Sequence, residues 1–466
     1  MLPTIKPTDP LTDMKKSILI LSILFSFSAC MVGPKYQRPS MSSPTAYYRN
    51  GPYITGKDSV SSLKWFDLFG DPVLKSLLDS AIRRNYDLKI AVARIGQAEA
   101  SYGIARAALL PSLYYSAGAT EQFNASGNGT TFSFGTGLSW ELDIWGKIRH
   151  AKRAALDDIL ASEESRKAVQ STLVAAVSNA YFQLRDYDNR VVISKATFAS
   201  REEGYRLQQE RFSKGYISEW DLLQAKQLLE DARASIAAYE RASAVTEHFI
   251  CSLIASPPGS VARGLENASQ PLPPAIPSGL PSTLLEQRPD IKRAEYVYMR
   301  ETERIGITVA QRFPTLSLTG MLGFASGDLS TLVSSDALAG SLTQGLLGPI
   351  FAFGANKRRV EVQKKAAEIA AYNYADLNLT ALREVEDALV TIATTTRELQ
   401  ARTDQAAAAG KVLTLSQARY DNGFTSYLEL LDAQRTLFET ELLVSAVRQQ
   451  QLNGYVELYR ALGGGW

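Results

Sequence analysis

Two acidic residues near the C-terminal end of the chain have the clearest potential for chemistry. Glu429 and Asp432 follow Gly423 and are three positions apart, so a helix would present both carboxylates on one face. Crowded carboxylates attract cations, so such a pair could bind or attract them. The same two residues could instead solvate the first turn of a helix, where negative charge interacts favourably with the helix dipole.

Nothing else in the chain points to catalysis. There are two histidines, His150 and His248, each expected on a helix as a hydrogen-bonded (satisfied) or solvated side chain, and two cysteines, Cys30 and Cys251. A phosphate-binding glycine loop, a Gly-x-Ser-x-Gly nucleophile elbow and a His-Glu-x-x-His zinc motif are all missing from the sequence. We therefore expect no enzyme, no cofactor, no metal site and no disulfide framework.

The composition is that of an ordinary folded protein without a nucleic-acid partner. The 466 residues are 45% hydrophobic and 21% charged, and 50 Lys and Arg against 48 Asp and Glu leave a net charge of +2. This length suffices for two or three domains or for one large elongated domain. No long run of one charge suggests binding to DNA or RNA.

The N-terminus has the pattern of a secretory signal. Lys15 and Lys16 precede an apolar run from Ile18 to Ala29, which is shorter than the roughly twenty residues needed to span a bilayer. We expect residues 1–29 to be a signal peptide, with translation starting at Met14 rather than Met1.

Cys30 is the expected site of a lipid anchor. Ser28 and Ala29 place small residues directly before it, which resembles the lipobox of bacterial lipoproteins, so Cys30 would become the acylated first residue of the mature chain. By the same resemblance, Met31 in place of an aspartate favours the outer membrane. Residues 30–64 would form an extended, lipid-anchored segment. An ordinary signal peptide followed by a coincidental cysteine is the alternative.

The chain contains an internal duplication. Residues 211–225 match residues 419–433 at an offset of 419 − 211 = 208, and an upstream offset of 203 pairs Asp87 with Asp290. The first repeat is expected to cover residues 65–255 and the second residues 282–466. Residues 256–281 between them are rich in proline and are expected to be an extended linker.

Each repeat is expected to contain two strands. Apolar residues alternate with small or polar ones at Phe132, Phe134, Leu138, Trp140 and Leu142, which indicates one apolar and one polar face. Ser133 and Ser139 lie on the polar side. The second repeat has similar stretches, from Leu316 to Phe324 and near Leu342 to Phe353. Strands of a soluble β-sandwich would show the same alternation.

Long helices flank these strands. A helix is expected from Pro72 to Ala108, and the proline-free stretch 147–213 carries an apolar helical stripe along 67 residues, which corresponds to a rod of roughly 100 Å. Its counterpart is 355–421. Gly215 and Gly423 follow as stop signals. A plain coiled-coil scaffold would also have such rods.

The expected strands suggest an assembly. Strands exposed to lipid must close into a barrel, because an open edge leaves backbone groups unpaired, and four strands are too few to enclose a channel. If the strands cross a membrane, several chains must share one barrel, with the rods continuing it as a helical tube.

Several motifs then resemble a known family. The chain is similar to the outer-membrane efflux protein family of TolC-like outer-membrane factors, and more narrowly to its lipoprotein branch with OprM-like and NodT-like members. The resemblance covers nearly everything after residue 30. The motifs that carry it are Cys30–Pro39, Trp65–Pro72, Trp140–Lys147 and Leu280–Ile291.

The resemblance implies a mixed α and β fold in a homotrimer. Four strands per chain would form a twelve-stranded transmembrane β-barrel, shared between protomers and continued by a long periplasmic α-helical barrel. The partners would be outer-membrane lipid, a periplasmic adaptor (membrane fusion) protein and an inner-membrane pump. Neither catalysis nor a cofactor is implied.

The resemblance also implies a closed gate at the periplasmic tip, where the rods turn. Glu429 and Asp432 match paired acidic residues that constrict the pore, while Asp221 and Tyr420 match positions that form closing links. Thr425 stands where some members have a basic residue. In the first repeat, Asp221 corresponds to Glu429 and a glutamine corresponds to Asp432.

We therefore expect a passive outer-membrane channel lipoprotein, the exit duct of a tripartite efflux or export system. The outer-membrane component of a type I protein secretion system remains open, as do a periplasmic coiled-coil scaffold without a pore and an exported enzyme. The sequence does not name the cargo, because the pump rather than the duct selects it.

Overall fold

The computed structural model describes residues 31–39, 70–124, 127–272 and 287–464. The expected signal peptide, its start at Met14 and the lipid-bearing Cys30 lie outside these residues. The chain separates into two compact units, which we call the strand unit and the helical unit. The strand unit comprises residues up to 40, 93–163 and 293–375, and the helical unit comprises 41–92, 164–292 and 376–466.

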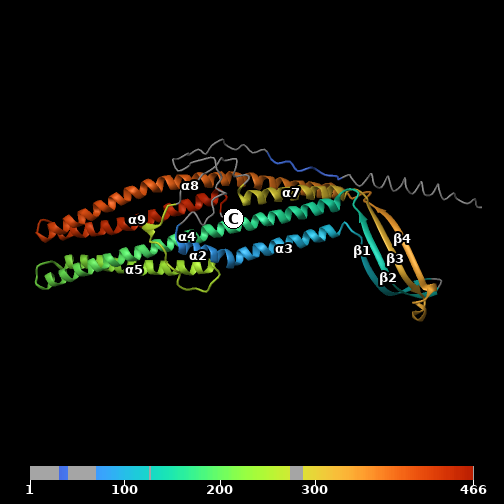
Figure 1. The fold of residues 1–466 in the computed structure, drawn as a ribbon, viewed down its shortest axis with the longest axis horizontal. Coiled ribbons are helices and arrows are strands. Elements are labelled where there is room, and N and C mark those ends of the chain that lie inside the picture. The colour runs from blue at the N-terminus through green and yellow to red at the C-terminus, as the bar shows by residue number, and fades with distance from the viewer. Residues whose placement is uncertain (1–30, 40–69, 125–126, 273–286, 465–466) are drawn as a thin grey trace, which may run out of the picture. The chain divides into compact units, whose positions relative to one another are not determined.

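Most of the described chain is helical (Figure 1). The two long helices, α4 (Lys147–Ser213) and α8 (Ala355–Asp421), have 67 residues each and confirm the rods expected from the sequence. They are followed by α5 (Glu219–Leu253) and α9 (Tyr427–Ala461), with 35 residues each. The other helical elements are α2 (Pro72–Arg84), α3 (Tyr86–Ala107), α7 (Pro289–Ala310) and the 3₁₀ turns η3 (Asn267–Ser269), η5 (Leu329–Thr331) and η6 (Ser335–Ala337).

The element boundaries confirm the internal duplication. Helix α8 begins and ends 208 residues after α4, since 355 − 147 and 421 − 213 both equal 208, and the same offset relates α9 to α5. Helix α7 follows α3 at an offset of 289 − 86 = 203. The two offsets are those found in the sequence, so the repeat holds at the level of whole helices.

One expected helix is divided in two. The stretch from Pro72 to Ala108 breaks at Asn85, whose backbone is extended at ψ 134°. The Asn85 side chain accepts a hydrogen bond from Leu88 N at 3.1 Å and donates one to Leu253 O at 2.9 Å. Asn85 thus caps α3 and ties it to the end of α5, a contact that helical periodicity cannot reveal.

The strand unit contains an antiparallel sheet in the order β1-β2-β3-β4 (Figure 1). The strands are β1 (Ser112–Asn124), β2 (Gly127–Leu142), β3 (Thr315–Ser326) and β4 (Leu338–Leu347). The last strand begins and ends earlier than the 342–353 expected from the sequence. It stops before Gly348 and Pro349, where proline has no N–H to donate to a ladder.

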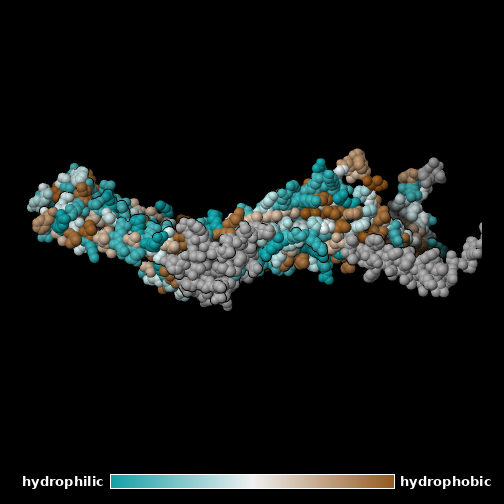
Figure 2. Space-filling model, turned by 90° about the horizontal axis from the view of Figure 1, so that it is seen from above, coloured by the Kyte–Doolittle hydropathy of each residue, from teal (hydrophilic) through white to brown (hydrophobic). Residues whose placement is uncertain are grey.

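The register gives the sheet two different faces, because residues directly opposite each other share a face. Leu138 pairs with Leu113 on one side and Gly320 on the other, and Phe134 pairs with Phe324. Ser133 and Ser139 lie on the opposite face. Figure 2 shows hydrophobic residues, in brown, reaching the surface. We call the face that carries Leu138 and Phe134 the apolar face. Its exposed members include Leu113, Phe134, Leu322, Leu338, Leu342 and Leu346.

The helical unit has a hydrophobic core around α4, which contributes Tyr181, Phe182 and Leu184, all fully buried. Helices α2, α8 and α9 pack their own apolar residues into the same cluster. Among the residues that the structure describes, no helix is both long and apolar enough to cross a bilayer.

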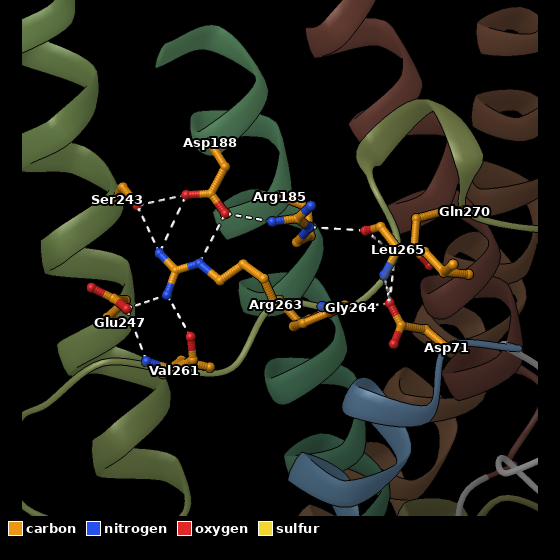
Figure 3. A network of polar contacts seen from close by, with 11 residues as sticks. Asp71, Arg185, Asp188, Ser243, Glu247, Val261, Arg263, Gly264, Leu265 and Gln270 are labelled. Atoms are coloured by element: carbon orange, nitrogen blue, oxygen red, sulfur yellow. Dashed lines mark hydrogen bonds and ion pairs between the residues drawn. The ribbon is translucent and has the colours of Figure 1, made fainter. Parts of the chain in front are cut away.

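The first part of the linker between the repeats is fixed by a polar network (Figure 3). Arg263 donates to Asp188 at 3.0 Å and contacts Glu247. Asp71, the N-cap of α2, accepts hydrogen bonds from Leu265 N at 2.9 Å and from Gln270 Nε2 at 2.7 Å. Residues 256–272 are therefore docked on the helical unit and include the turn η3, rather than being extended throughout as their proline content suggested.

Candidate functional site: the ends of the helical hairpins

The turns that join each long helix to the next are built alike. Gly215 and Gly423 have φ angles of +76° and +73°, a conformation that favours glycine. Tyr216 N donates to Arg211 O at 2.9 Å, and Phe424 N donates to Arg419 O at 2.8 Å, which closes both helix ends in the Schellman manner. The structure thus confirms the helix stops expected at the two glycines.

In the first hairpin, Asp221 caps the start of its own helix, α5. Ser218 is the N-cap of α5, and its hydroxyl accepts a hydrogen bond from Asp221 N at 3.2 Å. The Asp221 carboxylate in turn accepts hydrogen bonds from Ser218 N at 3.3 Å and from the Ser218 hydroxyl at 2.8 Å. This is a capping box, which stabilises the start of the helix.

In the second hairpin, both expected gate carboxylates have partners. Glu429 accepts a hydrogen bond from the Thr425 hydroxyl and lies 3.5 Å from the Arg419 guanidinium. Asp432 forms an ion pair with Arg435 at 2.5 Å. The side chains of Glu429 and Asp432 are 42% and 59% exposed, so both remain accessible to ions in a single protomer.

The two carboxylates line one groove between α5 and α9. The groove has a volume of about 490 Å³. Gln224 and Gln227 of α5 face it from the other side. Within the described part of the chain, no cluster of three or more His, Cys, Asp or Glu side chains could hold a metal ion. In one protomer the groove contains two acids, and Arg435 lines it beside them.

Tyr420 connects the second hairpin to the first. Its hydroxyl accepts a hydrogen bond from Arg211 Nη1 at 2.6 Å and one from Gln208 Nε2 at 3.1 Å. The Arg211 guanidinium also lies 5.1 Å from the centre of the Tyr420 ring, within range of a cation–π interaction. Asp221, the other residue that matches a closing-link position, is engaged with Ser218, as described above.

Tyr427 completes this contact. Its ring centroid lies 5.2 Å from that of Tyr420. Burial, together with the nearby Tyr420, raises the pKa of Tyr427 to about 12, so its hydroxyl stays protonated at neutral pH. The contact between the hairpins therefore combines the rings of Tyr420 and Tyr427 with two donors from α4, Arg211 and Gln208.

The sequence reasoning missed Arg211, Gln208 and Tyr427. Arg211 was visible as the equivalent of Arg419 at the offset of 208, but equivalence did not reveal that the two arginines take different partners. Arg419 forms an ion pair with Glu429 of its own hairpin, whereas Arg211 donates a hydrogen bond to Tyr420 of the other hairpin.

Comparison with known proteins agrees with this architecture. The family described as "Outer membrane efflux protein" matches residues 77–252 and 280–464 of the chain. The probable efflux pump outer membrane protein TtgC of Pseudomonas putida is 32% identical over 468 residues, which cover 97% of this chain and 96% of that protein. The cation efflux system protein CusC of Escherichia coli is 30% identical and covers 96% of this chain and 98% of its own length.

The fold is also shared with solved structures. The MtrE outer membrane channel of Neisseria gonorrhoeae, in its open state, superposes with a TM-score of 0.84 at 29% identity, covering 94% of this chain and 98% of that one. These matches confirm the family resemblance that the sequence motifs suggested.

Proposed function

Because the chain belongs to the outer membrane efflux protein family and is an outer-membrane efflux channel, we propose that it is the passive exit duct of a tripartite system, gated at its periplasmic tip. It would work as a homotrimer, receiving its cargo from an inner-membrane pump through a periplasmic adaptor protein. No step of chemistry is required of the duct itself.

The open sheet supports a shared barrel. The edges of the described sheet are β1 and β4, each paired on one side, and an unpaired edge in lipid leaves backbone groups without hydrogen bonds. Pairing β4 of one protomer with β1 of the next would close twelve strands in a trimer. The apolar face would then contact lipid, and the face with Ser133 and Ser139 would line the lumen.

The hairpin ends support a gate. Threefold symmetry would bring three copies of Glu429 and Asp432 together as acidic rings, and the links of Tyr420 to Arg211 would hold neighbouring hairpins closed. Opening would break these links. A helix start that merely carries favourable negative charge is the alternative role for the two acids.

The anchor and the cargo are further parts of the proposal. Cys30 would be acylated and would hold the chain to outer-membrane lipid in addition to the barrel. The relatives described above are named for efflux pumps and a cation efflux system, which favours small-molecule or ion cargo over secreted proteins.

The observation that carries the proposal is the open sheet with one apolar and one polar face. Leu138 lies on the apolar face and its neighbour Ser139 on the other. Leu138→Arg should place a charge in lipid at a cost of about 2–4 kcal/mol near the bilayer midplane, whereas Ser139→Arg should be tolerated in the lumen.

Detergent-resistant trimers and conductance in planar bilayers measure the difference. We expect Leu138→Arg to reduce trimer yield strongly, and Ser139→Arg to leave trimers intact with altered ion selectivity. Equal effects of the two substitutions, or a purified protein that is monomeric and does not conduct, would refute the shared transmembrane barrel.

A further inference from the structure

The first described residues of the chain lie in a fitted site on the strand unit. Val32 N donates a hydrogen bond to Trp145 O at 3.2 Å, and Val32 O is 3.2 Å from His150 Nε2. A side chain at Gly146 would collide with Met31, because a Cβ there would lie 2.8 Å from Met31 Cγ. Met31 and Val32, the two residues after Cys30, thus touch the segment that links β2 to α4.

Two glycines make room for this contact. Gly33 has a φ of +150°, and a Cβ on it would lie 2.7 Å from the Cα of Gly306 on α7. A Cβ on Gly306 would overlap the imidazole of His150. The peptide, the ring and α7 therefore approach each other as closely as backbone atoms permit.

His150 is held firmly in this position. Its side chain is 5% exposed, and its Nδ1 lies 2.5 Å from a carboxylate oxygen of Glu303 on α7. The second ring nitrogen is thereby directed at Val32 O. Glu303 orients the ring, and the ring binds the peptide.

Further contacts extend the site along the peptide. The Tyr36 hydroxyl donates to Glu295 at 2.8 Å, and the Tyr36 ring lies edge-on to Tyr298 at 5.5 Å between centroids. Arg38 forms an ion pair with the same Glu295 at 3.0 Å. The contacts from Met31 to Arg38 explain why this segment carries glycine and tyrosine where it does.

The site lies next to the ends of the strands. Gly146 follows the last residue of β2 by four positions, and the Trp145 ring stacks on Phe313, just before β3, at 4.5 Å between centroids. The Trp145 indole N–H donates to Pro314 O at 2.7 Å. Aromatic rings with a polar group are typical of the boundary between lipid and water.

We propose that Trp145, Gly146, His150, Glu303 and Gly306 form a peptide-binding seat that positions the lipid-bearing N-terminus at the membrane boundary of the strands. The inference rests on the proposed acylation of Cys30, which is bonded directly to Met31. The seat recognises the backbone of residues 31–33 and is complete without the lipid. His150 acts in it as a positioning residue.

Trypsin provides a direct test on the mature full-length trimer. Lys35 is exposed, and trypsin does not cut the Arg38–Pro39 bond, so the Lys35–Tyr36 bond reports whether residues 31–38 are docked. His150→Ala and Gly306→Ala should each speed cleavage at this bond by about tenfold. His248→Ala, a change at the exposed histidine on α5, should leave the rate unchanged.

The double variant separates a seat from a general loss of stability. In the His150→Ala background, the added methyl of Gly306→Ala no longer strikes a ring, so it should not speed cleavage further. The proposal would be overturned if the two substitutions increased the cleavage rate independently, so that their effects multiplied in the double variant. It would also be overturned if the Gly306→Ala variant were cleaved at the wild-type rate. If neither variant yields trimers, Tyr36→Phe tests the other end of the peptide, with cleavage expected to rise about threefold; an unchanged rate would count against the seat.

Cys30→Ser distinguishes the seat from the lipid. The unacylated chain should keep the Lys35–Tyr36 bond protected, because the seat holds the peptide alone; a loss of protection would show that the membrane holds it instead. Mass spectrometry of the wild-type N-terminal peptide reports acylation separately. A protected but unacylated terminus would refute the lipid anchor and leave the peptide site standing.

Discussion

Arg211 Nη1 lies 2.6 Å from the hydroxyl oxygen of Tyr420, a residue of the other repeat. The equivalent arginine, Arg419, lies 3.5 Å from Glu429 in its own hairpin. Two copies of one ancestral position thus form two different contacts. The tip is therefore held by an asymmetric link that only one of the two arginines provides.

Breaking this link should favour the open channel. A hydrogen bond from a charged group contributes about 1.5–3 kcal/mol, so Arg211→Ala or Tyr420→Phe should raise the open probability in planar bilayers by at least about tenfold. Arg206→Ala is a matched control, because among the described residues that arginine forms its ion pairs with Glu203 and Glu210 of its own helix. If all three variants conduct like wild type, the contact does not keep the tip closed.

The acidic pair should control block by cations. Glu429→Ala combined with Asp432→Ala should remove block by divalent or trivalent cations added from the periplasmic side, with trimer assembly intact. Arg435→Ala should strengthen the block, since it frees Asp432 from its ion pair. Glu203→Ala, which removes an exposed acid from α4, serves as the control. If cations block the double variant as they block wild type, the two acids do not form the cation site. Their role would then be to stabilise the start of α9 through the helix dipole.

Gly137 in β2 should tolerate no side chain. It pairs with Tyr114 of β1, and a Cβ on Gly137 would lie too close to Tyr114 Cζ for two non-bonded carbons. Gly137→Val should therefore displace the ring and lower the temperature at which trimers dissociate in detergent. Tyr114→Ala should restore much of the loss in the double variant, because the obstacle is gone. A double variant less stable than Gly137→Val alone would contradict this account.

Asp71 should make stability depend on acid pH. Hydrogen bonds from Tyr181 and Gln270 hold the pKa of this buried carboxyl below its usual value of 3.8, although burial opposes them. Its stabilising contribution is therefore complete above about pH 4 and is lost as the pH falls through the folded-state pKa.

Chemical unfolding measures this contribution. Asp71→Ala should lower the free energy of unfolding by about 3 kcal/mol at neutral pH, and should reduce the further loss of stability in acid. Asp79→Ala, at an exposed ion pair on the same helix, should change stability by less than about 1 kcal/mol. A neutral-pH effect of Asp71→Ala no larger than that of Asp79→Ala would show that the network is dispensable.

The sequence predicted those elements that depend on local pattern. The absence of proline and the offset of 208 gave the bounds of α4 and α8, and the glycine stops gave the turns at Gly215 and Gly423. Alternation in β2 separated Phe134 from Ser133 correctly, because side chains in a strand alternate whatever the strand pairs with.

The features that the sequence missed depend on distant partners. Asn85 breaks a helix by bonding to Leu253, 168 residues away, and Tyr420 takes its donors from α4 of the other repeat. His150 was expected to be a satisfied or solvated histidine and is indeed hydrogen-bonded, but its partners Val32 and Glu303 could not be named, because neither is near it in sequence. Such contacts follow from tertiary packing and leave no periodic trace.

A row of small residues crosses the sheet on the side opposite the apolar face. Ser116, Gly135, Gly323 and Ala339 stand opposite one another on the four strands, and a Cβ on Gly135 would lie 2.8 Å from Gly323 Cα. Glycines within strands allow tight bends, so the wall can curl toward this side along the row. The size of the side chains in this row thus sets how strongly the sheet can curve. A larger residue at any of the four positions should make the sheet flatter.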